Sequence, residues 1–308
     1  MRKRVILFLC FTLSIFIIDR GIAFKMDSLY QNNYCANSGG GLNYYLKFQK
    51  ADTLFIGSSR VKTMIISDVI GKNVLNITAN GKHFYYQASV IHLLEQYNKL
   101  PKKMIVLNLE AEDIYKECES ELINEVFYLK YYYDKNAFVK NVIDSKSPFE
   151  KYKFLMSSYK FNGENFLLFT NQFQHICDDN HNSYQLLKPK KSDSSKVINA
   201  IKENNKLKSK EVNSHFFEIL KSIDTLCKRD KIKLVILYGP HYVYLKRHES
   251  ASLIMQGFCK KNRISYLDFN TKKTTQFKNI HCWSDILHLN KDAALVYTKL
   301  IEEELNKL

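Results

Sequence analysis

Short apolar runs alternate along the chain with stretches whose apolar residues recur at helical spacing. Five runs rich in Val, Ile, Leu and Phe predict buried strands, over 52–59, 73–78, 103–110, 233–240 and 264–269. Residues 83–99 carry apolar positions at helical spacing, and residues 292–308 predict a closing amphipathic helix. Strands that alternate with helices are typical of a parallel sheet with helices on both faces. The pattern therefore predicts an α/β protein, a three-layer α/β/α sandwich with a mainly parallel sheet.

A long segment interrupts this alternation after the third predicted strand. Residues 111–205 are rich in Tyr, Phe, Lys and Asn, as in FYLKYYYDK at 127–135, and contain no clear parallel-strand unit. We interpret them as a helical, aromatic and basic insertion. Such an insertion suits a lid or a partner surface over a site, and a solvated basic loop explains the composition equally well.

The N-terminus has the layout of an export signal. Arg2, Lys3 and Arg4 precede fourteen residues without a charge, 5–18, and Gly21 and Ala23 then offer a small-x-small cleavage site. A helix of fourteen residues spans roughly 21 Å, which is short of the ~30 Å hydrocarbon core. We expect residues 1–23 to be either a cleaved signal peptide or an anchor in the inner membrane. Residues 24–308 are then one periplasmic or otherwise extracytoplasmic domain.

The expected export affects which partner the positive charge of the chain indicates. The 308 residues include 46 Lys and Arg against 31 Asp and Glu, a net charge of +15. Eight lysines lie between 188 and 210 with only two acidic residues. This excess suits nucleic acid or an anionic envelope surface, and an exported protein meets the second. We therefore expect contact with the membrane surface through the N-terminus and no nucleic-acid partner.

The cysteines indicate neither a metal site nor a defined disulfide framework. The seven cysteines form no CxxC pair and no zinc-binding pattern, and HExxH is absent, so no metal and no cofactor is expected. Cys10 lies in the apolar run. We expect the other six to be mostly buried small apolar residues with one or two disulfides, whose connectivity the spacing leaves open.

Two short motifs carry candidate chemistry. Gly57-Ser58-Ser59-Arg60 follows the first strand, where a serine at a tight strand-to-helix turn suits a nucleophile, although a simple helix N-cap explains the same motif. Asp285 and His288 are three residues apart, so on one turn they face the same way. An aspartate can then orient the imidazole that accepts a proton from serine. Ser59, His288 and Asp285 are the candidate catalytic residues.

Taken together, these motifs resemble the SGNH (GDSL-like) hydrolase superfamily, over roughly 50–110 and 230–308. The Gly-Asp-Ser block resembles Gly57 to Ser59 with serine in place of aspartate, and D-x-x-H matches Asp285 and His288. The second block resembles 76–81 and implies Gly81 as an oxyanion donor. The third block, G-x-N-D, is not matched here. The third strand runs into NLEAED, and Asn108 lies two positions before the place of the expected asparagine. The resemblance implies an oxyanion hole from the N–H groups of Ser59 and Gly81, with Asn108 as a weak third member.

GSSR and the export segment together look most like the envelope branch of this superfamily, which includes O-acetyltransferase-like and D-alanyl-transfer-like proteins. That likeness implies a serine esterase or O-acyltransferase acting on acylated envelope or exopolysaccharide glycans or on a small ester. It also implies a membrane-bound acyl-transfer partner. The alternative is a non-catalytic glycan-binding or assembly protein of the same fold. His241 suits either a pocket wall or core packing, and Trp283 suits the core.

Overall fold

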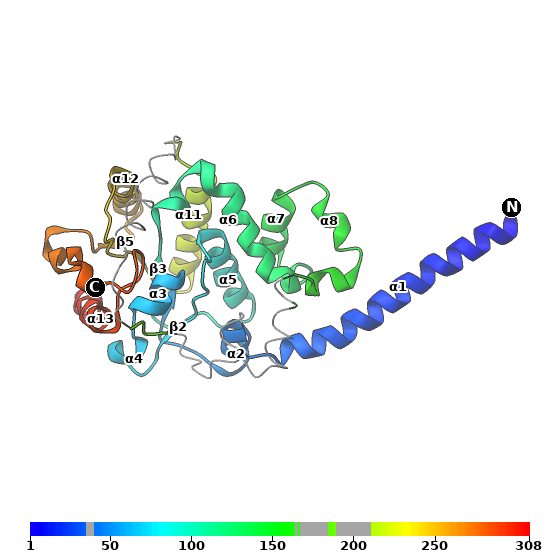
Figure 1. Ribbon diagram of the computed structural model, residues 1–308, viewed down its shortest axis with the longest axis horizontal. Helices are drawn as coiled ribbons and strands as arrows, with labels where there is room; N and C mark the ends of the chain where they lie inside the picture. The colour runs from blue at the N-terminus through cyan, green and yellow to red at the C-terminus, as the bar shows by residue number, and fades with distance from the viewer. Residues whose placement is uncertain (35–39, 164–165, 167–183, 189–210) are drawn as a thin grey trace. The chain divides into compact units, whose positions relative to one another are not determined.

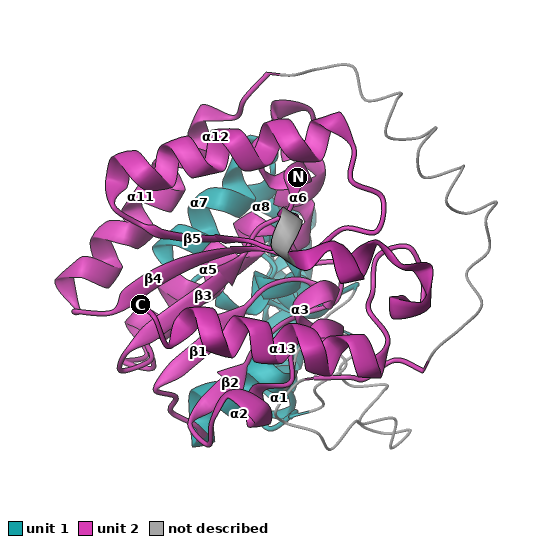
Figure 2. Ribbon diagram, turned by 90° about the vertical axis from the view of Figure 1, so that its left-hand side faces the viewer, with its two compact units in different colours: residues 1–48, 126–181 teal, residues 49–125, 182–308 magenta. Residues whose placement is uncertain are grey.

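The computed structural model of the chain describes residues 1–34, 40–163, 166, 184–188 and 211–308 (Figure 1). It divides into two compact units (Figure 2). Unit 1 contains residues 1–48 and 126–181, and unit 2 contains residues 49–125 and 182–308.

Unit 2 is built on a parallel sheet whose five strands confirm the five predicted from the sequence. The strands lie in the order β2-β1-β3-β4-β5, and every neighbouring pair is parallel. Their bounds are β1 (Thr53–Ile56), β2 (Val74–Asn76), β3 (Met104–Asn108), β4 (Lys233–Tyr238) and β5 (Ser265–Asp268).

Helices cover both faces of this sheet and confirm the three-layer sandwich (Figure 2). One face carries α3 (Ser59–Met64), α4 (Ser67–Ile70) and α13 (Lys291–Leu305), and the other carries α5 (Phe84–Gln96), α11 (Ser214–Arg229) and α12 (Lys246–Asn262). Alternate strand residues such as Phe55, Val106 and Val235 share one buried cluster with Ala294 and Tyr297 of α13. The period of two along each strand therefore places one set of side chains under each helical layer.

Shorter elements complete unit 2. After β3 come the 3₁₀ segments η2 (Ala111–Ile114) and η3 (Lys116–Cys118) and the helix α6 (Glu119–Glu125). After β5 come η6 (Lys272–Lys278) and η7 (Ile280–Cys282). The segments η2, η3 and α6 are the start of the predicted insertion.

Unit 1 joins the N-terminal helix to part of the insertion. It contains α1 (Arg2–Gln31), α2 (Gly40–Phe48), η4 (Val126–Tyr132), α7 (Ala137–Ser145), α8 (Glu150–Lys153) and η5 (Ser157–Phe161). Residues 111–163 of the insertion form mainly helical elements, and the described residues 184–188 form none. The lysine-rich stretch after Lys188 lies outside the described residues.

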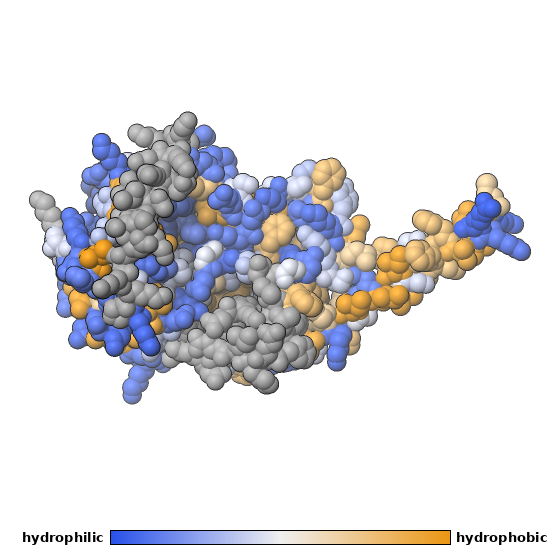
Figure 3. Space-filling view, viewed as in Figure 1, coloured by the Kyte–Doolittle hydropathy of each residue, from blue (hydrophilic) through white to orange (hydrophobic). Residues whose placement is uncertain are grey.

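The two halves of α1 have different surroundings. In the second half, buried Asp19 accepts the backbone N–H groups of Ser157 at 2.7 Å and Ser158 at 2.9 Å, and Tyr30 stacks on Tyr131 with ring centroids 4.0 Å apart. In the first half, nearly every apolar side chain of 5–18 is exposed. Figure 3 shows this helix as an apolar rod with hydrophilic residues at its free end. Among the described helices, α1 alone is long and apolar enough to cross a membrane.

The described cysteines are free thiols, namely Cys10, Cys118, Cys227, Cys259 and Cys282. Cys227 and Cys259 are buried, as expected of small apolar residues. Cys35 and Cys177 lie outside the described residues.

Gly57 is expected to tolerate no side chain, because a Cβ there would lie 2.4 Å from Cγ2 of Val61 and 3.0 Å from Cβ of Asn108. We expect Gly57→Ala to lower the free energy of unfolding by about 1–3 kcal/mol, since forced overpacking costs that much. The matched control is Gly257→Ala in α12, where nothing lies within 4 Å. Because alanine favours helix over glycine, the control should gain up to about 1 kcal/mol in urea denaturation. Equal stability changes in the two variants would contradict the tight turn after β1.

Candidate active site

The sequence left open whether the serines after β1 supply a nucleophile or a helix N-cap. In the structure, Ser58 is the cap and Ser59 is the candidate nucleophile. Ser58 is the N-cap of α3, and its Oγ accepts the backbone N–H of Arg60 at 3.3 Å. Ser59 is the first residue of α3. The N–H groups of a first helical turn have no partner within the helix, so the N–H of Ser59 is free to bind a ligand oxygen. The cap therefore leaves the Ser59 hydroxyl available for chemistry.

The structure brings together the three residues that the motifs singled out. Ser59 Oγ lies 2.9 Å from Nε2 of His288, although 229 positions separate them in the chain. His288 Nδ1 lies 2.9 Å from Oδ2 of Asp285. The three side chains form one hydrogen-bonded line from carboxylate to imidazole to hydroxyl.

Asp285 is held as a carboxylate that orients the imidazole. Burial raises its pKa, but hydrogen bonds from the His288 ring and from the backbone N–H groups of Leu287 and His288 outweigh burial and lower the pKa below its ordinary value. A carboxylate can only accept, so Nδ1 of His288 carries the proton that it donates. Nε2 then presents a lone pair to the Ser59 hydroxyl, as a general base requires.

A hydrogen-bonded loop carries Asp285 and His288. The backbone N–H of Ser284 donates to the carbonyl of His288 at 2.9 Å, which closes the loop. Trp283 is buried and donates Nε1–H to the carbonyl of Phe277 at 2.7 Å, in agreement with its predicted place in the core. Asn290 ends the loop as the N-cap of α13.

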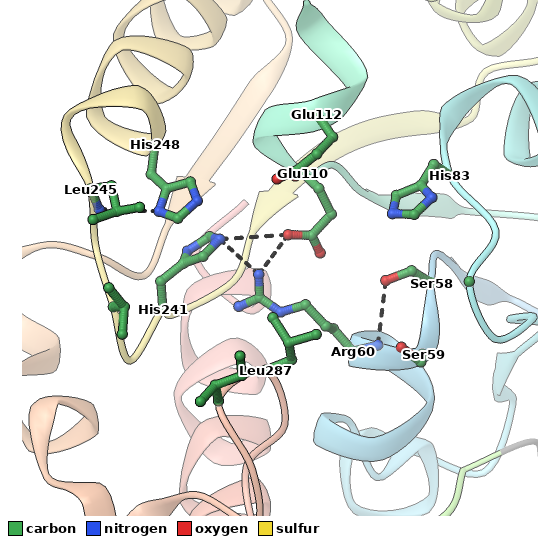
Figure 4. Close-up of a pocket in the computed structure, with 13 residues that line it drawn as sticks. Ser58, Ser59, Arg60, His83, Glu110, Glu112, His241, Leu245, His248 and Leu287 are labelled. Atoms are coloured by element: carbon green, nitrogen blue, oxygen red, sulfur yellow. Dashed lines mark hydrogen bonds and ion pairs between the residues drawn. The ribbon is translucent and has the colours of Figure 1, made fainter. Parts of the chain in front are cut away.

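Ser59 opens on a cavity of about 350 Å³ (Figure 4). One part of its wall is apolar and is formed by Val243, Leu245, Ile286 and Leu287. The rest is formed by Gly81 and by the polar or charged residues Ser58, Ser59, Arg60, His83, Glu110, Glu112, His241 and His248. The cavity therefore offers an apolar surface and hydrogen-bonding groups to the same ligand.

The two other predicted oxyanion residues differ in their surroundings. Gly81 lines the cavity and has a φ of +62°, a backbone conformation that favours glycine. Asn108 is buried, is not among the residues that line the cavity, and donates its Nδ2–H to Oε1 of Glu110 at 2.8 Å. The side-chain amide of Asn108 therefore binds Glu110, whereas Gly81 lines the cavity together with Ser59.

A buried ion pair that the sequence analysis missed lies directly beside the candidate nucleophile. Arg60 Nη1 contacts Oε2 of Glu110 at 2.5 Å, and its other terminal nitrogen donates to the carbonyl of Pro240. Both side chains are at most 8% exposed. Burial raises the pKa of Glu110, but the Arg60 charge and hydrogen bonds hold it well below the ordinary range, so both groups are ionised.

His241 supplies the third member of this cluster and combines the two predicted possibilities, since it lines the cavity and its side chain is only 8% exposed. Its Nε2 lies 2.8 Å from Nη1 of Arg60, which can only donate, so Nε2 is an acceptor. Burial and the Arg60 charge lower the pKa of His241, which keeps the ring neutral. The stacked His248 is also neutral, because burial and the nearby Arg60 charge lower its pKa to about 3.

His83 and Glu125 form a second histidine–carboxylate pair that the sequence analysis also missed. The Nδ1 of His83 lies 2.7 Å from Oε1 of Glu125, and the other carboxylate oxygen accepts the His83 backbone N–H at 2.5 Å. Nearby Asp113 is fully buried, and burial raises its pKa to about 7. The signal available in the sequence was the position of His83, two residues after Gly81.

Comparison with known proteins gives structural likeness only. No family model matches the chain, and no curated protein matches it. The chain is similar to the crystal structure of a protein from Bacteroides fragilis NCTC 9343 described as a "putative acylhydrolase", at 12% identity, with a TM-score of 0.40, over 85% of this chain and 92% of that one. It is also similar to a GDSL-like lipase from Bacteroides thetaiotaomicron VPI-5482, at 13% identity, with a TM-score of 0.37, over 83% of this chain and 87% of that one.

Glu110→Gln is expected to lower the free energy of unfolding by about 3–5 kcal/mol, because it leaves the Arg60 charge buried without its counter-charge. The matched control is Glu304→Gln, which breaks the exposed pair with Lys307 and should cost about 0–1 kcal/mol. Denaturant unfolding at pH 7 measures both. Because the folded pKa of Glu110 lies below the unfolded value, its stabilisation is present above the ordinary carboxyl pKa and is lost as the pH falls. A Glu110→Gln loss no larger than the control would contradict the ion pair.

Proposed function

We propose that the protein is a serine-dependent esterase or O-acyltransferase in which Ser59 is the nucleophile. The observation that carries this proposal is the hydrogen-bonded chain of Asp285, His288 and Ser59, with Ser59 in the wall of a cavity. A hydrogen-bonded chain of carboxylate, imidazole and hydroxyl activates an otherwise weak hydroxyl nucleophile. The SGNH-like motifs at the same residues support the same chemistry.

The first half of the proposed reaction transfers the acyl group to the enzyme. Ser59 Oγ bonds to the carbonyl carbon of an ester, and its proton passes to Nε2 of His288 while the carbonyl π pair moves to oxygen. The backbone N–H groups of Ser59 and Gly81 bind that oxyanion. When the C–O bond to the leaving alcohol breaks, His288 returns the proton to the departing oxygen, and the acyl group stays on Ser59.

The second half decides between the two activities. His288 takes a proton from an incoming water or sugar hydroxyl, whose oxygen attacks the acyl carbon and releases Ser59 with its proton. Water gives hydrolysis, and a hydroxyl gives transfer. The apolar wall and the volume of about 350 Å³ suit a short acyl group on a glycan or a small ester.

The surroundings of α1 support an uncleaved membrane anchor over a cleaved signal peptide. Cleavage after Ala23 would remove Asp19, which binds two backbone N–H groups of η5. The exposed apolar residues of 5–18 suit lipid, and the cations Arg2, Lys3 and Arg4 suit the cytoplasmic side. We therefore place the catalytic unit outside the cytoplasm, where it can meet a membrane-bound acyl-transfer partner.

The alternative is a glycan-binding or assembly protein without catalysis. The occupied amide of Asn108 favours it, since a missing oxyanion donor costs about 10²–10³ in rate. The same cavity would then bind an acylated sugar and leave it intact.

Ser59→Ala is expected to lower the turnover of p-nitrophenyl acetate by at least ~10³-fold and to abolish labelling by a fluorophosphonate. His288→Ala should lose turnover to a similar extent, because the two residues act as a unit. The matched control is Ser222→Ala on α11, which does not line the cavity. Labelling that survives Ser59→Ala would disprove the nucleophile, and a wild-type protein that neither turns over esters nor labels would support the binding alternative.

The anchor is tested by the N-terminus of the protein recovered from membranes. We expect an intact mass that includes residues 1–23, and retention in the membrane fraction after carbonate extraction. Deleting residues 2–18 should release the protein into the soluble fraction. A mature chain that begins at Phe24 would contradict the anchor and identify a signal peptide.

A further inference from the structure

His83 lies in the same cavity as Ser59 and has a fixed orientation. Figure 4 shows its imidazole on the side of the cavity where Ser58 and Ser59 lie, opposite His241 and His248. Glu125 binds both Nδ1 and the backbone N–H of His83, so rotation of the ring out of this position would break the Nδ1 contact. No described residue accepts a hydrogen bond from Nε2 of His83. The ring is thus clamped at one nitrogen and free at the other.

The charges around His83 make it a hydrogen-bond donor. Burial lowers its pKa, but the hydrogen bond to Glu125 and the charges of Asp113, Glu125 and Glu110 outweigh burial and raise the pKa to about 9. The ring is therefore protonated at neutral pH, and both of its nitrogens donate. His288 differs, because it presents a lone pair to Ser59. One cavity thus contains a histidine arranged as a base and a second arranged as a donor.

The balance of charge in the cavity indicates what His83 binds. Arg60 is compensated by Glu110, and His83 is compensated by Glu125. Glu112 also lines the cavity and forms no ion pair with any described residue. This lining offers no net positive charge to a substrate that is already anionic. A fixed N–H donor is suited instead to a charge that develops during the reaction.

We propose that Nε2–H of His83 is a third donor to the oxyanion of the tetrahedral intermediate, in the position that the amide of Asn108 does not fill. This inference rests on the acyl-transfer function proposed above. His83 follows Gly81 by two residues in the loop after β2, and both line the cavity with Ser59. The loop would therefore supply two of the three donors. No bond is made or broken at His83, because its proton stays on Nε2 throughout.

The first test compares variants of two histidines, His83 at the N-cap of α5 and His92 within α5, with p-nitrophenyl acetate as substrate. His83→Ala is expected to lower kcat by about 10²–10³-fold and to change KM by less than about threefold, since the lost donor acts only on the transition state. His83→Gln, which keeps an N–H donor without the charge, should lose less. The matched control is His92→Gln, because His92 also pairs with a glutamate, Glu95, but does not line the cavity.

The second test uses the pH profile, which also covers the case in which His83→Ala fails to fold. In the wild-type protein, kcat should fall as the pH rises through about 9, where His83 loses its proton. Glu125→Gln removes the charge that holds this proton, so the alkaline fall should begin at least one pH unit lower. A His83 that is merely structural would leave the position of this limb unchanged.

The outcomes separate this inference from the function on which it rests. A wild-type protein without turnover or fluorophosphonate labelling disproves the proposed function. A wild-type protein that turns over, with His83→Ala within threefold of its kcat or Glu125→Gln with an unshifted alkaline limb, disproves the role of His83 alone. Equal losses in His83→Ala and His92→Gln would also overturn it.

Discussion

The buried ion pair between Arg60 and Glu110 constrains the whole candidate site. Two charges out of water need each other and every further hydrogen bond they can make. Arg60 therefore binds Glu110, Pro240 and His241, which follow β3 and β4, from its place in the first turn of α3. Since Ser59 precedes Arg60, the same contacts hold the hydroxyl at the carboxyl ends of the central strands.

This ion pair also explains why the sequence after β3 differs from the G-x-N-D block of SGNH-like hydrolases. Glu110 recruits the amide of Asn108, and a neutral His241 accepts from Arg60. An asparagine engaged in this way is a poor oxyanion donor. The end of β3 thus stabilises the turn that carries Ser59, the proposed nucleophile, and the additional oxyanion donors that we propose lie in the loop after β2.

The N-terminal helix in unit 1 also contains a buried charged side chain that is stabilised by hydrogen bonds. A lone aspartate at the end of an apolar run is costly in an apolar environment unless its oxygens are bound. Asp19 meets this need by accepting two backbone N–H groups of η5, a segment 138 positions away from it. The contact gives the apolar helix a fixed end, and the fourteen preceding residues remain exposed along their length.

The sequence by itself determined the layers and the candidate catalytic residues. Strand and helix periodicities reflect burial, which is a local property, so all five strands and the closing helix α13 were predictable within a few residues. Ser59, Asp285 and His288 were predictable because short motifs fix their spacing and local turns. Tertiary structure alone decided the surroundings of Arg60, Glu110 and His83. Each depends on a charged or polar partner 42 to 181 positions away, and no local pattern encodes which distant charge will be buried beside it.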